Sequence, residues 1–578
     1  MHTTRALPLL LVLLLSTPPL LAQSGEAPLL PESWRAVSEE GPWVVRVDFE
    51  GAARRNLLDQ RADVWGLDRD KGQLVALVTE DEAQQLLAEG WNLVFDRDRT
   101  ETMQSLGTPL ENQGTGIPGF PCYRTVEETL ATGAAIALAN PGLATWTDVG
   151  DSWEKLDDAS NGWDLFVLKL TQSAIPGEKP VFFANFAIHA REYATAELGT
   201  RFAEYLVNNY GTDPDVTWLL DYHEVHLMLQ TNPDGRKQAE TGDLWRKNTN
   251  NDYCSNSSSR GADLNRNFEY EWNCCGGSSG QQCSDVYRGP SAASEPEIQA
   301  LQNYVRSIFP DQRGDAIGDP APDDATGVAI DIHSFGELVL WPWGFTTAQT
   351  ANGVAFATLG RKIAFFNDYF PLKITQFTVA DGSSADFFYG DLGIAGLGFE
   401  LGSDFFESCA NFEANIVDEN IAALLYAAKV ARTPYLTPAG PEAFGAQAQP
   451  ATVSPGDVVL LTASLDDTRF SNANGSEPTQ TIANAQAFVD QPPWVLGATP
   501  IAMVASDGTF DTASEGVEVI LDTTGFAPGR HTLFVQGTDS DGNTGIVSAV
   551  FLEVIGDSAI FDDGFESGDL SAWSSGGR

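Results

Sequence analysis

Two side chains that can bind a metal ion, His189 and Glu192, stand between a predicted strand and a predicted helix. The apolar run at residues 180–185 predicts a buried strand, and the helix formers at 196–207 predict the helix. In open α/β sheets, ligands bind at this end of the strands. An imidazole and a carboxylate three positions apart can both bind Zn²⁺. A catalytic zinc site also needs a third protein ligand and one open position.

Few residues qualify as the third ligand, because the chain contains only six histidines. His2 lies in the leader, and His531 lies far downstream. His223 and His226 lie on opposite faces of a predicted strand. His333 remains, at the polar end of the apolar run 328–332. We therefore expect His189, Glu192 and His333 to bind one Zn²⁺ ion.

Further motifs follow these residues in a fixed order. The ordered set is His189-Ala190-Arg191-Glu192, Asn232-Pro233-Asp234-Gly235, Leu244-Trp245-Arg246-Lys247, Asp263-Leu264-Asn265-Arg266-Asn267, His333-Ser334 and Phe399-Glu400-Leu401. In this order and spacing the motifs resemble the signature of the zinc carboxypeptidases of the carboxypeptidase A type. The resemblance runs from about residue 122 to residue 432. It implies an α/β fold with a central mixed sheet flanked by helices.

The resemblance also implies a role for several single residues. Glu400 is expected to take a proton from the zinc-bound water and to pass it to the leaving amine. Arg246 matches the arginine that stabilises the developing oxyanion. Asn265 and Arg266 match the residues that bind the terminal carboxylate of a peptide, and Arg191 matches a further substrate contact. This set predicts an enzyme that trims peptide ends.

One position departs from the family pattern. The family carries a tyrosine on a mobile loop, and Thr378 stands in its place here. The positions that match the specificity pocket are Leu340, Ala385 and Gly398, which favour an apolar C-terminal residue on the substrate. Asp381 lies close by in the sequence, so a mixed preference also remains open.

The residues before the catalytic region predict export and activation. Residues 1–22 combine a basic start, an apolar run and small residues before the end, as in a secretory signal peptide. Residues 23–117 predict a small α+β unit that resembles the activation propeptide of the family. The Gly/Pro-rich segment 108–118 predicts the site where an activating protease removes it. A permanent N-terminal domain is the alternative.

The catalytic region is expected to span residues 118–432, and the composition changes after it. Residues 433–457 are rich in Pro, Gly and Ala and predict a linker. The short β-rich runs at 458–556 suggest an Ig-like β-sandwich. The last segment, 557–578, resembles a short tail found on some secreted bacterial proteins.

Six cysteines in an exported chain predict disulfides. Cys254 and Cys283 match a bridge of the family and flank Asn265-Arg266. With the two neighbouring cysteines at 274 and 275 they are expected to form two local bridges, and the connectivity of these four cysteines remains open. Cys122 and Cys409 then pair across the catalytic region. The absence of a Cys-x-x-Cys motif and the export signal disfavour a cysteine zinc site.

The composition restricts the classes of partner. With 33 Lys and Arg against 80 Asp and Glu, the formal net charge is −47. Bulk electrostatics therefore exclude nucleic acid and anionic membranes as partners, and no run beyond the leader reaches membrane-spanning length. The sequence predicts a secreted zinc metallocarboxypeptidase that acts on peptides or proteins with a free C-terminus. An amidase or peptidoglycan-trimming peptidase on the same scaffold, and a catalytically silent binding protein, are the alternatives.

Overall fold

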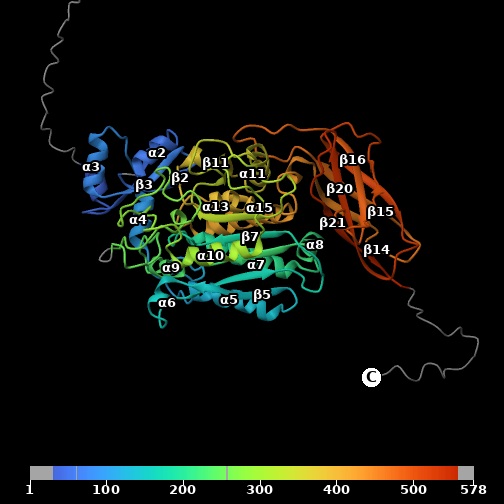
Figure 1. Ribbon diagram of the computed structural model, residues 1–578, viewed down its shortest axis with the longest axis horizontal. Helices are drawn as coiled ribbons and strands as arrows, with labels where there is room; N and C mark the ends of the chain where they lie inside the picture. The colour runs from blue at the N-terminus through green and yellow to red at the C-terminus, as the bar shows by residue number, and fades with distance from the viewer. Residues whose placement is uncertain (1–29, 60, 255–257, 557–578) are drawn as a thin grey trace, which may run out of the picture.

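The computed structural model describes residues 30–59, 61–254 and 258–556. The predicted signal peptide (1–22) and tail (557–578) therefore lie outside the described residues. Three units follow one another along the chain, and the N-terminal and C-terminal units lie on opposite sides of the central one (Figure 1). Among the described residues, no helix is long and apolar enough to cross a membrane.

The N-terminal unit is a four-stranded antiparallel sheet in the order β2-β3-β1-β4, with helices packed against it. Its elements are α1 (Glu32–Arg35), β1 (Trp43–Asp48), α2 (Ala52–Asp59), β2 (Asp63–Asp68), β3 (Gln73–Val78), α3 (Glu80–Ala88), β4 (Val94–Phe95) and α4 (Arg97–Ser105). Helix α3 begins at a capping box, in which the Thr79 side chain accepts the Glu82 N–H and the Glu82 carboxylate accepts the Thr79 N–H. The α+β architecture is the one that the sequence predicts.

The central unit is built on an eight-stranded sheet in the order β11-β10-β12-β9-β7-β8-β6-β5. Its strands are β5 (Ala144–Asp151), β6 (Asp164–Leu170), β7 (Val181–Phe186), β8 (Glu224–Met228), β9 (Val328–Ser334), β10 (Leu338–Trp341), β11 (Phe370–Lys373) and β12 (Ala395–Leu401). The four strands β8, β7, β9 and β12 are parallel, whereas β5, β6 and β10 pair antiparallel with their neighbours towards the centre. The prediction of an α/β fold with a central mixed sheet is confirmed.

Helices cover both faces of this sheet, which is why every residue of β7 is buried. Phe182, Ala184 and Phe186 pack in one core with α7, α8, α11 and α15, and Phe183 packs on the other face with α10 and α13. The helical segments are α5 (Val126–Ala139), α6 (Trp153–Asp157), α7 (Tyr193–Asn209), α8 (Pro214–Tyr222), α9 (Pro233–Glu240), η1 (Leu264–Arg266), α10 (Pro296–Ile308), α11 (Gly353–Asn367), α12 (Ile374–Phe377), α13 (Ser384–Leu392), α14 (Cys409–Asn411), η2 (Phe412–Ile416), α15 (Val417–Lys429) and η3 (Thr437–Ala439).

The C-terminal unit consists of two packed β-sheets, in the orders β13-β15-β19-β18 and β14-β21-β20-β16-β17. Its strands are β13 (Glu442–Gln449), β14 (Thr452–Val453), β15 (Val458–Asp466), β16 (Ile482–Val489), β17 (Ile501–Ala502), β18 (Val504–Ala505), β19 (Ser514–Asp522), β20 (Gly529–Asp539) and β21 (Ser548–Val554). Alternate residues of β15 are buried between the sheets, as expected for a strand with one face in the core. A β-sandwich was the prediction for this region.

The prediction that residues 433–457 are a linker is wrong in part, because β13 and β14 lie within it. Strand β13 pairs with β15, and β14 pairs with β21, so both are edge strands of the sandwich. Strand β13 consists mostly of Ala, Gln and Gly, which give little strand propensity, and β14 has only two residues. The pairing to distant strands decides the conformation, which composition does not reveal.

The sandwich packs directly against the central unit. Asp215 at the start of α8 accepts the backbone N–H of Ala549 at 2.8 Å and forms an ion pair with Lys429 at 2.6 Å. On α11, Arg361 donates to the backbone carbonyl of Asn474 at 2.7 Å and forms an ion pair with Glu477. The two units therefore share a polar interface in addition to the apolar core.

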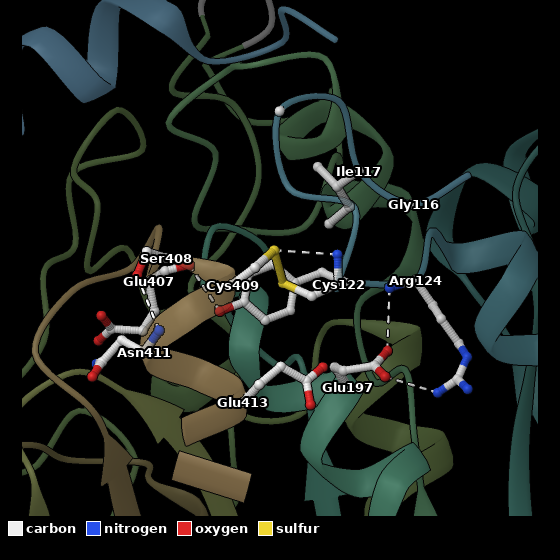
Figure 2. Close-up of a disulfide and its surroundings, with 12 residues drawn as sticks. Gly116, Ile117, Cys122, Arg124, Glu197, Glu407, Ser408, Cys409, Asn411 and Glu413 are labelled. Atoms are coloured by element: carbon white, nitrogen blue, oxygen red, sulfur yellow. Dashed lines mark hydrogen bonds and ion pairs between the residues drawn. A yellow bond between two sulfur atoms is a disulfide. The ribbon is translucent and has the colours of Figure 1, made fainter. Parts of the chain in front are cut away.

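All six cysteines form disulfides: Cys122–Cys409, Cys254–Cys283 and Cys274–Cys275. The pair Cys122–Cys409 and the presence of two local bridges are as expected, and the structure decides the connectivity of the local bridges, which the sequence left open. Figure 2 shows the first of these, which joins the segment just after residues 108–118 to α14. The neighbouring Arg124 binds Glu197 of α7, with its Nη1 2.9 Å from Oε1. This bridge spans 287 positions of the sequence, whereas Cys274 and Cys275 are adjacent.

We expect the double variant Cys122→Ser/Cys409→Ser to unfold about 5–10 °C below the wild type. The long-range bridge lowers the conformational entropy of the unfolded chain and thereby stabilises the fold by about 3 kcal/mol. A bridge between adjacent residues closes no loop and has little such effect. Differential scanning calorimetry measures the shift, and Cys274→Ser/Cys275→Ser is the matched control with a nearly unchanged midpoint. Equal shifts in the two variants would contradict this account.

Candidate active site

The carboxyl ends of three parallel strands bring the predicted metal ligands together. His189 and Glu192 lie between the end of β7 and the start of α7, where Glu192 is the N-cap residue. His333 is on β9, the neighbour of β7, and Glu400 on β12 stands opposite His333 in the strand register. Short-range sequence pattern places each residue at a strand end, and the parallel pairing makes these ends adjacent.

His189, Glu192 and His333 offer ligand atoms that all lie within 4.8 Å of one another, and all three residues are buried. The two Nδ1 atoms are 3.2 Å apart, and the Glu192 carboxylate lies 2.7 Å from His189 Nδ1 and 3.3 Å from His333 Nδ1. Two imidazole nitrogens and a carboxylate are the donor set of a catalytic zinc site with an open fourth position. The residues present therefore fit a zinc ion.

The distal nitrogen of each histidine is bound by a buried aspartate. His189 Nε2 lies 3.1 Å from Asp263 Oδ1, and His333 Nε2 lies 2.8 Å from Asp331 Oδ2. These contacts fix the ring orientations and leave both Nδ1 atoms directed at the shared position. The sequence interpretation did not assign either aspartate, although Asp331 precedes His333 by two residues and therefore lies on the same face of β9.

Electrostatics favour the charged forms of the cluster. Burial alone would lower the pKa of His333, but the Asp331 and Glu192 carboxylates raise this pKa well above its usual value. Burial alone would raise the pKa of Glu192, but the two histidines hold it well below its usual range. A divalent cation bound here would take the place of the proton on the His333 imidazole.

Glu400 is partly buried at the edge of the same cavity. Desolvation and, to a smaller extent, the Glu192 carboxylate raise the pKa of Glu400 to about 8, although His333 lowers it. A zinc ion beside Glu400 adds positive charge and lowers this pKa towards neutral pH. The environment is therefore suited to a carboxylate that accepts and releases a proton.

Asp263 also positions the residues predicted to contact substrate. Its Oδ2 accepts from Arg246 Nη2 at 2.9 Å, and its Oδ1 accepts the backbone N–H of Asn265 at 3.0 Å. The turn η1 then directs Asn265 and Arg266 into the same cavity as the metal-binding cluster. The structure thus brings all the predicted catalytic and carboxylate-binding residues to one cavity, including Arg191, whose guanidinium is bound by Asp63.

Comparisons with known proteins agree with this geometry. The family model described as zinc carboxypeptidase matches residues 130–419. The chain belongs to the zinc carboxypeptidase family. A zinc carboxypeptidase of Saccharothrix mutabilis subsp. capreolus is 30% identical over 364 residues, which cover 60% of this chain and 78% of that protein. Mouse carboxypeptidase A2 is 29% identical over 276 residues, which cover 48% of this chain and 58% of the mouse protein.

Solved structures agree with the fold. The carboxypeptidase A of Helicoverpa armigera superposes with a TM-score of 0.55 at 22% identity, covering 67% of this chain and 98% of that one. A structure of thrombin activatable fibrinolysis inhibitor superposes with a TM-score of 0.53 at 18% identity, covering 68% and 99%. Family membership makes this chain a zinc metallocarboxypeptidase, a hydrolase with one catalytic zinc ion.

The positions predicted to form the specificity pocket lie in a cavity of about 880 Å³. Leu340, Ala385 and Gly398 line it, together with Ile374 and Phe377, and all these side chains are apolar. Thr378, which replaces the family tyrosine, also lines the cavity.

Asp381 does not contribute a free carboxylate to this pocket. Its side chain is fully buried and accepts hydrogen bonds from the backbone N–H groups of Cys275 and Gly277 and from the Ser278 hydroxyl. The mixed preference that the sequence left open therefore has no support in the pocket geometry.

The N-terminal unit covers the cavity from the solvent side. Asp63 on β2 forms two hydrogen bonds with Arg191, at 2.6 and 2.8 Å, and leaves Arg191 only 1% exposed. Arg55 and Asp59 of α2 line the same cavity, and Arg55 lies over the ring of Phe377 at 4.0 Å. Arg191, expected to contact substrate, is thus bound by the chain itself.

We expect the variant Asp331→Asn to bind Zn²⁺ about 10- to 100-fold more weakly than the wild type. The side-chain amide of this variant holds the His333 ring less firmly than the Asp331 carboxylate does. The amide also lacks the negative charge with which the carboxylate increases the basicity of the imidazole. Competition with a chelator of known affinity measures the zinc dissociation constant. Asp467→Asn, which replaces a buried carboxylate of the sandwich that accepts the Gln480 N–H, is the control. An unchanged dissociation constant in Asp331→Asn would show that this contact does not orient the ligand.

Proposed function

We propose that this enzyme is exported, is made as an inactive precursor and removes the C-terminal residue of peptides and proteins. The observation that carries the proposal is the position of Arg266 in the cavity that also holds His189, Glu192, His333 and Glu400. An arginine fork beside the hydrolytic centre recognises a carboxylate, so the scissile bond is the last one of the chain. Asn265 next to it supplies an amide for the same group.

The chemistry follows from the groups that surround the proposed zinc site. His189, Glu192 and His333 would hold the zinc ion, which would polarise the scissile carbonyl and lower the pKa of its bound water. Glu400 is placed to accept a proton from that water and to pass it to the leaving amine. Arg246, whose pKa is raised by Asp263 and Glu192 despite burial, remains positively charged and stabilises negative charge on the carbonyl oxygen.

The apolar pocket favours substrates that end in an apolar or aromatic residue. Leu340, Ile374, Phe377 and Ala385 supply the contact area, and Gly398 leaves room because a methyl group there would still be 3.7 Å from Leu340 Cβ. Burial of an apolar side chain against these residues stabilises the complex by about 25 cal/mol per Å² of surface removed from water.

We infer that residues 23–117 act as an activation propeptide. The Asp63–Arg191 pair and the approach of α2 to Phe377 keep the cavity covered. Residues 108–112 are exposed and follow the last helix of the unit, so they offer an activating protease an accessible segment. The leader pattern at residues 1–22 and the three disulfides support export to an oxidising environment.

A peptide series that varies only in its last residue tests the proposed activity. With the N-terminal unit removed by protease, we expect loss of single residues from free-acid peptides and none from amidated ones, with apolar ends preferred. Mass spectrometry identifies the products, and a zinc chelator abolishes them.

Glu400→Gln is the matched variant, which we expect to retain zinc while turnover falls at least about 100-fold. Cleavage of amidated peptides would indicate an amidase or another peptidase. Zinc binding with no cleavage of any peptide would indicate a silent binding protein.

We expect the uncleaved Asp63→Asn variant to be at least about tenfold more active than the uncleaved wild type. Loss of the paired charge weakens the contact with Arg191 by about 1.5–3 kcal/mol and shifts the N-terminal unit towards release. Hydrolysis of a free-acid peptide by the intact chain measures the effect. Asp48→Asn, at an exposed position of the same sheet, is the control. Full activity of the uncleaved wild type would instead mark the unit as a permanent domain.

A further inference from the structure

Arg266 is held by two main-chain carbonyls rather than by a carboxylate. Its Nη1 donates to the Asn265 carbonyl at 2.7 Å, and its Nε donates to the Gly277 carbonyl at 2.9 Å. Among the described residues no acceptor is bonded to Nη2, which leaves this group for a ligand in the cavity. The position of Gly277 therefore determines where the guanidinium plane lies.

Gly277 belongs to a turn, residues 274–278, that is bound to a single buried carboxylate. Asp381 Oδ2 accepts the backbone N–H of Cys275 at 3.1 Å and that of Gly277 at 3.0 Å. Asp381 Oδ1 accepts the hydroxyl of Ser278. Three donors of one turn thus converge on Asp381, which is fully buried.

The turn contacts the backbone of residues 380 and 381 so closely that it admits no side chain at its centre. A Cβ on Gly277 would lie 2.6 Å from the backbone nitrogen of Asp381 and 2.7 Å from Ala380 Cα. At the start of the turn, the disulfide between the adjacent residues Cys274 and Cys275 restricts the backbone that carries the first donor. The turn therefore has one preferred position relative to Asp381.

The same segment also fixes the partner of Arg266. The backbone N–H of Ser384 donates to Asn265 Oδ1 at 2.8 Å, and the Gly382 carbonyl accepts the backbone N–H of Phe268 at 3.0 Å. Residues 381–384 therefore hold Asn265 directly and hold Arg266 through the turn.

We propose that Asp381 is a positioning residue for Arg266, acting through the turn at residues 274–278 that begins with the Cys274–Cys275 disulfide. The inference rests on the proposed role of Arg266 in binding the substrate carboxylate. Asp381 touches neither the substrate nor the zinc ligands. Its loss therefore affects recognition of the free C-terminus and leaves the hydrolytic step intact.

The test is a comparison of KM and kcat in Asp381→Ala and Asp381→Asn, prepared as the full chain and assayed after protease treatment. For a free-acid peptide we expect Asp381→Ala to raise KM about tenfold while kcat stays within about twofold. Asp381→Asn still accepts the two backbone N–H groups and is expected to restore most of the wild-type KM. Asp467→Ala, at a buried aspartate of the sandwich, is the matched control.

A binding measurement separates this inference from the proposed function. Calorimetry of the zinc-loaded, protease-treated chain compares 3-phenylpropanoate, an apolar carboxylate, with its primary amide. If the wild type does not prefer the acid, Arg266 has been assigned wrongly and the proposed function fails. If the wild type prefers the acid and Asp381→Ala retains the same preference, only the positioning role is overturned.

Two further variants keep the inference testable if Asp381→Ala does not fold. Gly277→Ala pushes the turn away from Asp381, and we expect KM to rise with kcat nearly unchanged. Cys274→Ser/Cys275→Ser retains every backbone donor but opens the disulfide, and we expect KM to rise about two- to fivefold. A wild-type KM in both variants, or a fall in kcat without a rise in KM, would overturn the role of the turn.

Discussion

The buried carboxylate of Asp263 is the interaction on which the rest of the site depends. It binds His189, Arg246 and the backbone of Asn265 at the same time. Burial of a charge is unfavourable, but Arg246 and His189 lower the pKa of Asp263 well below its usual value and keep it ionised. One anion therefore fixes the relative positions of the metal-binding cluster, the proposed oxyanion-stabilising group and the turn that carries Arg266.

The pairing of the strands in the central sheet places several other residues of the site at the edge where Asp263 contacts His189. Parallel pairing of β7, β9 and β12 places His189, His333 and Glu400 at one edge, and antiparallel β10 supplies Leu340 opposite Gly398. The two specificity positions are thus neighbours in a rigid sheet. By contrast, the groups proposed to bind the carboxylate lie in loops, and loops need additional contacts to hold a fixed geometry. Asp263 and Asp381 provide such contacts on the two sides of Arg266.

The accessory units use the central unit in different ways. The N-terminal unit pairs Asp63 with Arg191 at the cavity. It is also held by the ion pairs Arg99–Asp404 and Arg69–Glu337 and by an apolar cluster that it shares with the central unit. The sandwich shares an apolar core with the central unit and forms the ion pair Arg361–Glu477 with it. In the proposed precursor the N-terminal attachment is lost after cleavage, and the attachment of the sandwich persists in the mature enzyme.

The sequence determined the metal-binding residues, the order of the motifs and the class of fold. Each depends on short-range pattern: an apolar run that ends in a polar corner, and motifs of a few residues at fixed spacing. The resemblance pointed to the Cys254–Cys283 bridge, but the connectivity of the four local cysteines stayed open until the fold paired Cys274 with Cys275. The β-sandwich was evident from regular short β-rich runs, but its edge strands β13 and β14 were not, because their pairing partners lie far along the chain.

Only the tertiary structure decided which charges meet. Asp63 and Arg191 are 128 positions apart, and Asp381 and Gly277 are 104 apart. Nothing in the local sequence distinguishes these aspartates from those that cover the surface of a strongly acidic chain. A buried charge is stabilised only by the particular donors that folding brings to it, so its role is set by long-range packing and not by its neighbours in the sequence.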